Sequence, residues 1–230
     1  MLVFAGLGNP VRTRYVNLAR IDDYKESFRL AALELQKKDP AILAKTAGVD
    51  IFIDEERTEL VVPFLGTNYI VSLSPDIDVR REKGAEEVPI PDKILMAHYL
   101  LGSSGRRNSG KLITFRQVAD GHFYFDAFQR RARDPFVNFF GGNGRLFVKC
   151  AREMGATSVA NGDFGMEFRV FPRICVQLVL WEGDDEFPAD ATILFDESIQ
   201  HYLPAEDIAV LSGSLVYRLI GLARKLQAVG

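Results

Sequence analysis

The sequence contains few of the residues on which several classes of protein depend. Its 230 residues include two cysteines, three histidines and one tryptophan. The two cysteines, Cys150 and Cys175, are too few for a disulfide framework or for a four-thiolate metal cluster within the chain. A charged and then apolar leader is also missing ahead of them, so the compartment that we expect is a reducing cytoplasm.

The chain also lacks a large charge of one sign and long apolar runs. Its formal net charge is -3 and its calculated isoelectric point is about 5.7, which argues against binding to nucleic acid or to an anionic membrane surface. The longest apolar runs, such as residues 174–181, are far shorter than the roughly 20 residues that a membrane-spanning helix requires. We therefore expect a soluble protein whose partner is a small molecule or another protein.

Two glycine-rich segments lack the spacing of known nucleotide-binding loops. Residues 1–10 are expected to form a strand and a turn, but the turn lacks the third glycine of the GxGxxG fingerprint. Residues 103–111, with the sequence SSGRRNSGK, lack the GxxxxGK[ST] spacing, and no strand precedes them. An anion-binding loop and an ordinary connector remain open for this segment, and the connector is favoured.

Hydrophobic periodicity predicts an α+β fold. The expected helices cover residues 22–38, 40–48, 92–101, 122–128, 134–140 and 145–154 and a C-terminal stretch from residue 203. The expected strands cover residues 50–54, 59–65 and 67–73, which form an antiparallel meander, and residues 112–115, 164–171, 174–181 and 191–196. Residues 75–91 are polar and predict an irregular loop. We expect a mostly antiparallel mixed sheet flanked by helices, with the C-terminal helix packed on it, in one domain of residues 1–230. The alternative is a domain boundary near residues 75–91.

The sequence FGMEFRVF at 164–171 alternates apolar and polar residues, as a strand with one solvated face does. The next segment, ICVQLVLW at 174–181, is apolar at every position except Gln177, which predicts a central strand covered on both faces. Cys175 lies within it and is expected to be a buried apolar side chain, because no histidine is near in sequence to lower its pKa.

An abrupt polar cluster follows this strand and predicts the site of a ligand, since ligands often bind where a buried strand ends. In one hypothesis its carboxylates bind a divalent cation, or one of them has a raised pKa and acts as an acid or base. In the other, which we favour, they form a solvated turn and helix caps, because Asp-x-Asp-x-Asp-Gly spacing is absent. No metal ligand is therefore assigned. The candidate ligand-binding residues are Trp181, Glu182, Asp184, Asp185, Glu186, Asp196, His201, Tyr202 and His98.

Several longer segments carry a resemblance to a protein family. These are WEGDDEFPADATILFD, YLPAEDIAVL, KILMAHYLL, ITFRQV and FPRICVQLVLW. From about Tyr24 onward the chain resembles an uncharacterised domain-of-unknown-function family of anaerobic bacteria and archaea. Some members look like fusions to a cysteine-rich iron–sulfur segment, and this resemblance implies an accessory role in anaerobic redox or one-carbon metabolism. The present sequence has no such segment, so an iron–sulfur role would require a separate partner.

Two classes of function follow from the sequence. The first is a binding or accessory module that takes a small molecule or a redox or iron–sulfur protein at the polar cluster. The second is an acid–base enzyme, a hydrolase or lyase, in which a carboxylate of residues 184–186 pairs with His98 or His201. The second class is weaker, because no nucleophile motif or metal-ligand spacing accompanies those residues.

Overall fold

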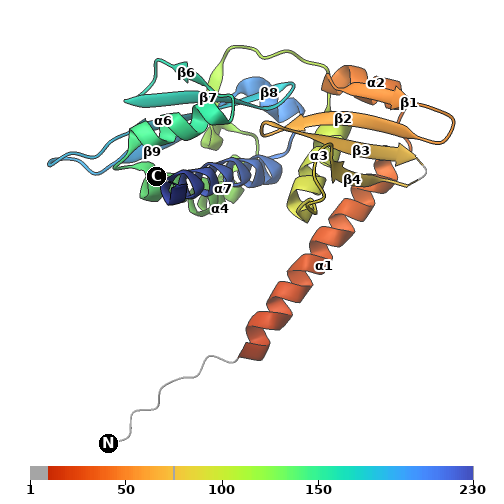
Figure 1. Cartoon of the computed structure of the whole chain (residues 1–230), viewed down its shortest axis with the longest axis horizontal. Helices are drawn as coiled ribbons and strands as arrows, with labels where there is room; N and C mark the ends of the chain where they lie inside the picture. Colours follow the sequence, from red (N-terminus) through yellow and green to blue (C-terminus); the bar gives the residue numbers. More distant parts are fainter. Residues whose placement is uncertain (1–9, 75, 230) are drawn as a thin grey trace, which may run out of the picture.

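The computed structural model describes residues 10–74 and 76–229 (Figure 1). Its helices are α1 (Pro10–Leu35), α2 (Pro40–Ala47), α3 (Ile90–Gly102), α4 (Gly121–Phe128), α5 (Asp134–Phe140), α6 (Gly144–Glu153) and α7 (Ala205–Val229). Its strands are β1 (Asp50–Ile53), β2 (Thr58–Phe64), β3 (Thr67–Ser74), β4 (Asp78–Arg81), β5 (Leu112–Thr114), β6 (Thr157–Val159), β7 (Phe164–Phe171), β8 (Ile174–Trp181) and β9 (Asp190–Asp196). The predicted α+β class is confirmed. The strand expected at the start of the chain lies outside the described residues.

The first sheet is the predicted meander with one additional strand. Its order is β1-β2-β3-β4, and every neighbouring pair is antiparallel. Strand β4 lies in the segment that was expected to be irregular, and that expectation was wrong, because Val79 is the one buried residue of β4 and gives no visible alternation. The turn between β2 and β3 has positive φ angles at Leu65 and Gly66, as hairpins with two-residue turns require.

The second sheet has the order β5-β9-β8-β7-β6 and is also antiparallel throughout. Strand β8 is buried from Ile174 to Leu180, as predicted for a central strand. Helices α6 and α7 lie on one face of this sheet (Figure 1), whereas Asn108 and Gly110, in the segment before β5, line a pocket with Cys175 and Gln177 of β8. Gly162 in the loop before β7 approaches Val179 so closely that an added Cβ would lie 2.5 Å from its Cγ1. The second face of β8 is therefore covered by chain segments without regular structure.

A column of aromatic rings joins the two sheets. Phe64 of β2 stacks on Phe171 of β7 with ring centroids 4.7 Å apart, and Phe171 stacks on Tyr99 of α3 at 4.2 Å. The Tyr99 hydroxyl is buried, donates to the Ala47 carbonyl at 2.6 Å and accepts from the Arg173 amide at 3.2 Å. Burial raises the pKa of Tyr99, so this hydroxyl stays neutral.

Local sequence explains the ends of α2, and α1 differs from its prediction. The Asp39 carboxylate caps α2 by accepting from the Ala41 and Ile42 amides, and Gly48 ends the helix at a φ of 71°.

Helix α1 begins at Pro10 rather than near Asp22 and ends at Leu35, so the predicted start was wrong. Pro10 at the first position is a common helix start that the apolar pattern did not show.

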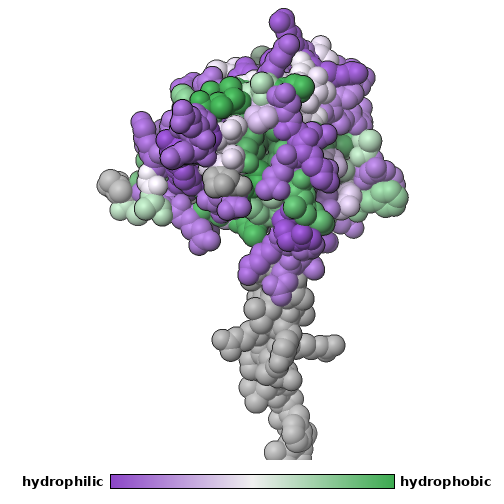
Figure 2. All heavy atoms as spheres, turned by 90° about the vertical axis from the view of Figure 1, so that its right-hand side faces the viewer, coloured by the Kyte–Doolittle hydropathy of each residue, from purple (hydrophilic) through white to green (hydrophobic). Residues whose placement is uncertain are grey.

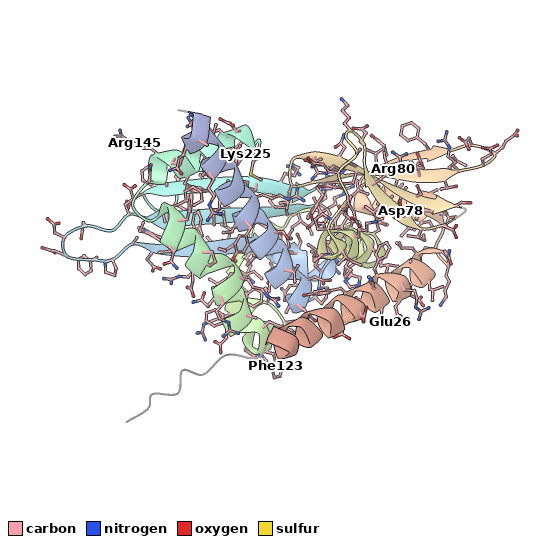
Figure 3. All side chains as sticks on the ribbon, turned by 60° about the horizontal axis from the view of Figure 1, so that its bottom comes forward. Glu26, Asp78, Arg80, Phe123, Arg145 and Lys225 are labelled. Atoms are coloured by element: carbon pink, nitrogen blue, oxygen red, sulfur yellow. The ribbon has the colours of Figure 1, made fainter. Side chains whose placement is uncertain are left out.

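The two aromatic-rich helices are joined by a π-helical turn, η2 (Gln129–Arg133), instead of being separated at Asp134. The Asp134 amide bonds to the Gln129 carbonyl, five residues earlier, and the next residue, Pro135, has no amide hydrogen to donate. The helices expected at 122–128 and 134–140 are therefore continuous, and the prediction that they are separate was wrong. Phe123 of α4 is 74% exposed and points outward in Figure 3.

Hydrophobic side chains also reach the surface on the side of the first sheet. Figure 2 views this side and shows hydrophobic areas between larger hydrophilic ones. Ile42 of α2 and Phe52 and Ile53 of β1 are all more than half exposed. In the described residues no helix is long and apolar enough to cross a membrane.

Candidate functional site

The acidic loop between β8 and β9 is a structured turn. The Asp184 carboxylate accepts from the Glu186 amide at 2.8 Å and from the Phe187 amide at 2.7 Å. The hydrogen bond from Phe187 and then that from Glu186 lower the pKa of Asp184, so it is not a carboxyl poised to donate a proton near neutral pH. Asp185 and Glu186 are exposed at the tip of the same turn.

Glu182 has a different role from the rest of the loop. Its carboxylate accepts from the Gly144 amide at 2.5 Å, at the first residue of α6, and its own amide donates to Asp163 at 3.0 Å. A carboxylate at this position complements the positive end of the helix dipole. Glu182 therefore anchors the loop to α6, while Trp181 before it is 40% exposed at the last residue of β8.

Asp196 is the most heavily bonded of the predicted residues, and it is buried. One carboxylate oxygen accepts from the amides of Ser109 and Ser198, both at 2.9 Å, and the other accepts from the Gly110 amide at 2.7 Å. Burial by itself would raise the pKa of Asp196, but the hydrogen bonds from these three residues outweigh it and lower the pKa. Asp196 thus fixes the segment at 103–111 against the second sheet.

His201 and Tyr202 contact the same segment through Arg106. The exposed His201 ring accepts at Nε2 from the Arg106 guanidinium at 3.1 Å, and the buried Tyr202 hydroxyl donates to the Arg106 carbonyl. The segment 103–111 is therefore a connector tied down by three predicted residues. A small pocket of about 170 Å³ lies beneath it, with Cys175 among its lining residues. Burial raises the pKa of the Cys175 thiol, and the prediction that Cys175 is buried is confirmed.

His98 lies apart from the acidic loop and is paired with a different carboxylate. Its Nδ1 is 2.7 Å from Oδ2 of the buried Asp207, in the first turn of α7. The hydrogen bond with Asp207 raises the pKa of His98, burial opposes this, and the charges of Asp207 and Glu206 add to the rise. The pair lines a cleft of about 210 Å³ between α1, α3 and α7, which also contains Tyr24 and Ser27.

The predicted residues therefore fall into three places. Residues 181–186 lie at one end of the second sheet, the connector 103–111 gathers Asp196, His201 and Tyr202, and His98 lies in the α1–α3–α7 cleft. In the ranges 10–74 and 76–229, no three histidine, cysteine, aspartate or glutamate side chains are grouped to hold a metal ion.

A further cleft is formed by residues that the sequence did not single out. It has a volume of about 660 Å³ and lies between α6 and the strands β6 and β7. Its apolar part is formed by Val148 of α6, Val159 of β6 and the first residues of β7, Phe164 to Met166. We call it the α6 cleft. A concave site with an apolar base and a few polar groups is typical of ligand binding.

Three cations of α6 form one wall of the α6 cleft. Arg145, Lys149 and Arg152 are spaced four and three residues apart, so they share one face of the helix. All three are exposed, Arg145 reaches outward in Figure 3, and none forms a salt bridge with a residue in the described part of the chain. Two carboxylates, Glu153 and Asp163, also line the cleft, and that of Asp163 is bonded to the loop. The spacing of the cations within a predicted helix is the signal that would have revealed this wall.

These features define an α+β protein with two antiparallel sheets, a cation-lined cleft and a histidine–aspartate pair. The chain belongs to the DUF3786 family, a domain of unknown function, whose family model matches residues 39–218. The search of curated proteins and the search of solved structures gave no match.

Proposed function

We propose that this protein is a binding module and that its ligand places an anionic group in the α6 cleft. The observation that carries the proposal is the row of three exposed cations above an apolar base. An anion on an apolar body would contact both parts of the cleft at once, and the cations would increase its rate of association.

The ligand is a small molecule or the surface of a redox or iron–sulfur protein. The family resemblance of the sequence supports a redox or iron–sulfur protein as the ligand. It also supports an accessory role in anaerobic redox or one-carbon metabolism. A cytoplasmic location is part of the same proposal, and Cys150 and Cys175, which are both free and buried, support it.

A pair of fluorescent probes tests the anion site. Anilinonaphthalene sulfonate carries an anion on an apolar body, and phenylnaphthylamine is its neutral counterpart. Reversing the charge of all three cations to glutamate should weaken sulfonate binding about tenfold, since each exposed charge contributes up to about 1 kcal/mol. Binding of the neutral probe should change little. The reversal K149E should show part of the effect, and K38E, which reverses an exposed lysine in the turn after α1, should show none. Equal sulfonate affinity in all variants would refute the proposal.

A second candidate function is acid–base catalysis at His98. The 2.7 Å contact with Asp207 fixes the ring and leaves Nε2 as the atom that can exchange a proton with a molecule in the cleft. Asp207 therefore takes the place of the acidic-loop carboxylate that the sequence analysis paired with His98. Incubating a mixture of cellular metabolites with the wild type and with H98Q, followed by mass spectrometry, tests it. A compound consumed by the wild type and not by H98Q supports catalysis, and identical mixtures argue against it.

A further inference from the structure

In the described part of the chain, the outer edge of β6 is an unpaired edge of the second sheet. β6 is the last strand of the second sheet, and β7 is its one neighbour. Its residues, Thr157 to Val159, carry no charge, and a strand at the end of a sheet presents backbone donors and acceptors on its free side. The free edge therefore lies next to the α6 cleft, which Ser158 and Val159 also line.

The opposite edge of the same sheet is protected. Strand β5 ends at Thr114, so Asp190 to Ile193 of β9 pair with β8 on one side and have no neighbouring strand on the outer side. There the Asp190 carboxylate accepts from the Ala191 amide at 2.7 Å and is held by an ion pair with Arg133. Charged side chains of this kind block the addition of another strand. In the described residues, the side-chain hydrogen bond at β6 runs from the Ser158 hydroxyl to the Met166 sulfur, and neither group is charged.

We propose that the anionic group in the α6 cleft belongs to an extended acidic segment of a partner protein, which adds a strand to β6. This inference rests on the proposed function and names the ligand. In strand addition, backbone hydrogen bonds hold the segment to the edge, and its alternate side chains enter the groove beside it. Acidic residues at alternate positions of the segment enter the α6 cleft and contact the cations, and the apolar residues between them extend the opposite face of the sheet.

The spacing of the cations fits a strand. Along a helix axis, residues four and three apart are about 6 Å and about 4.5 Å apart. Side chains on one face of a strand recur every two residues, about 6.6 Å apart. Acidic residues at alternate positions of the segment can therefore each face one of Arg145, Lys149 and Arg152. A compact anion such as free phosphate would contact one or two of them.

Three synthetic peptides test the inference. The first is a fluorescein-labelled heptapeptide of alternating glutamate and valine, the second has lysine in place of glutamate, and the third is the first with every second amide N-methylated. The first should bind at least about tenfold more tightly than the other two, because N-methylation removes ladder hydrogen bonds and lysine reverses the charge. K149E should weaken its binding and K38E should not. Fluorescence anisotropy measures affinity, and hydrogen exchange should show protection of the β6 amides.

The outcomes separate the two proposals. If the acidic peptide and its N-methylated form bind equally, or if no peptide binds while the sulfonate probe still responds to the cations, strand addition is wrong and the anion site remains. If neither the peptide nor the sulfonate probe responds to charge reversal, both proposals are wrong. Circular dichroism of each variant checks that loss of binding does not come from loss of the fold.

Discussion

Replacing Asp196 by alanine tests whether a single buried carboxylate holds the connector 103–111 on the second sheet. The wild-type side chain accepts from the amides of Ser109, Gly110 and Ser198 and from the Ser109 hydroxyl. The alanine variant leaves all of these donors without their acceptor. The expected result is a protein that still folds, because the apolar core is unchanged, but with lower stability and a looser connector.

The size of the effect follows from the exposure of the donors. Ser109 and Gly110 are exposed, so water can hydrate their amides once the carboxylate is gone. Ser198 is buried, and an unsatisfied buried amide costs about 1–3 kcal/mol. Adding a smaller loss for the exposed donors of Ser109 and Gly110 gives about 2–4 kcal/mol for D196A. D196N keeps the oxygen that faces Ser109 and Ser198 but turns an amide group toward Gly110, so it should lose about half as much.

Equilibrium unfolding in urea, followed through Trp181, the one tryptophan of the chain, measures both variants. The pKa of Asp196 is lowered in the folded protein, so its stabilisation is present above the unfolded pKa and is lost as the pH falls through the folded value. The gap between wild type and D196A should therefore be full at pH 7 and should narrow below about pH 4. A loss of less than about 1 kcal/mol at pH 7, or a gap that does not depend on pH, would refute this account.

Three further predictions concern other parts of the fold. Because the pKa of His98 is raised in the folded protein, its pair with Asp207 stabilises the fold fully below about pH 6.5 and loses this effect as the pH rises through the folded pKa. H98Q should therefore remove this pH dependence from the free energy of unfolding, measured in urea between pH 5 and 9. Y99F keeps the ring but leaves two backbone groups without the buried hydroxyl of Tyr99, so it should cost about 1–3 kcal/mol in the same assay. A neutral result would contradict a stabilising role of these two hydrogen bonds. D190A frees an edge amide that Asp190 and Arg133 protect, so light scattering should show more self-association than in the wild type, and no increase would argue against edge protection.

The parts of the fold that could be predicted are those whose burial follows a simple period. The apolar run of β8, the alternation of β7 and the capped helix α2 each carry a local signal that the tertiary structure preserves. Strand β4 and the π-helical turn lacked such a signal. β4 is set by pairing with β3, and the turn is set by Pro135 acting on a carbonyl several residues earlier.

The site was harder to predict because its geometry depends on residues far apart in the chain. His98 and Asp207 are 109 positions apart, and no pattern in either helix indicates that one faces the other. The same holds for Asp196 and the connector 86 positions earlier, although both segments were noticed separately. The many carboxylates of the acidic loop led to the prediction of a ligand site there. A high density of charge does not by itself define a binding site.

The acidic loop and the α6 cleft are nevertheless connected through Glu182. Because this carboxylate occupies the amide of Gly144, the N-terminus of α6 already has its anion, and a ligand in the cleft must be held by the side chains along the helix. Asn143 caps α6 by accepting from the Leu146 amide, and Glu182 adds a second acceptor at Gly144, one residue before Arg145, so the loop helps to hold the helix that carries the cation wall. The loop that the sequence highlighted thus contributes to the proposed binding site by positioning α6, while its own exposed carboxylates would repel an acidic segment and keep it on the β6 side of the cleft.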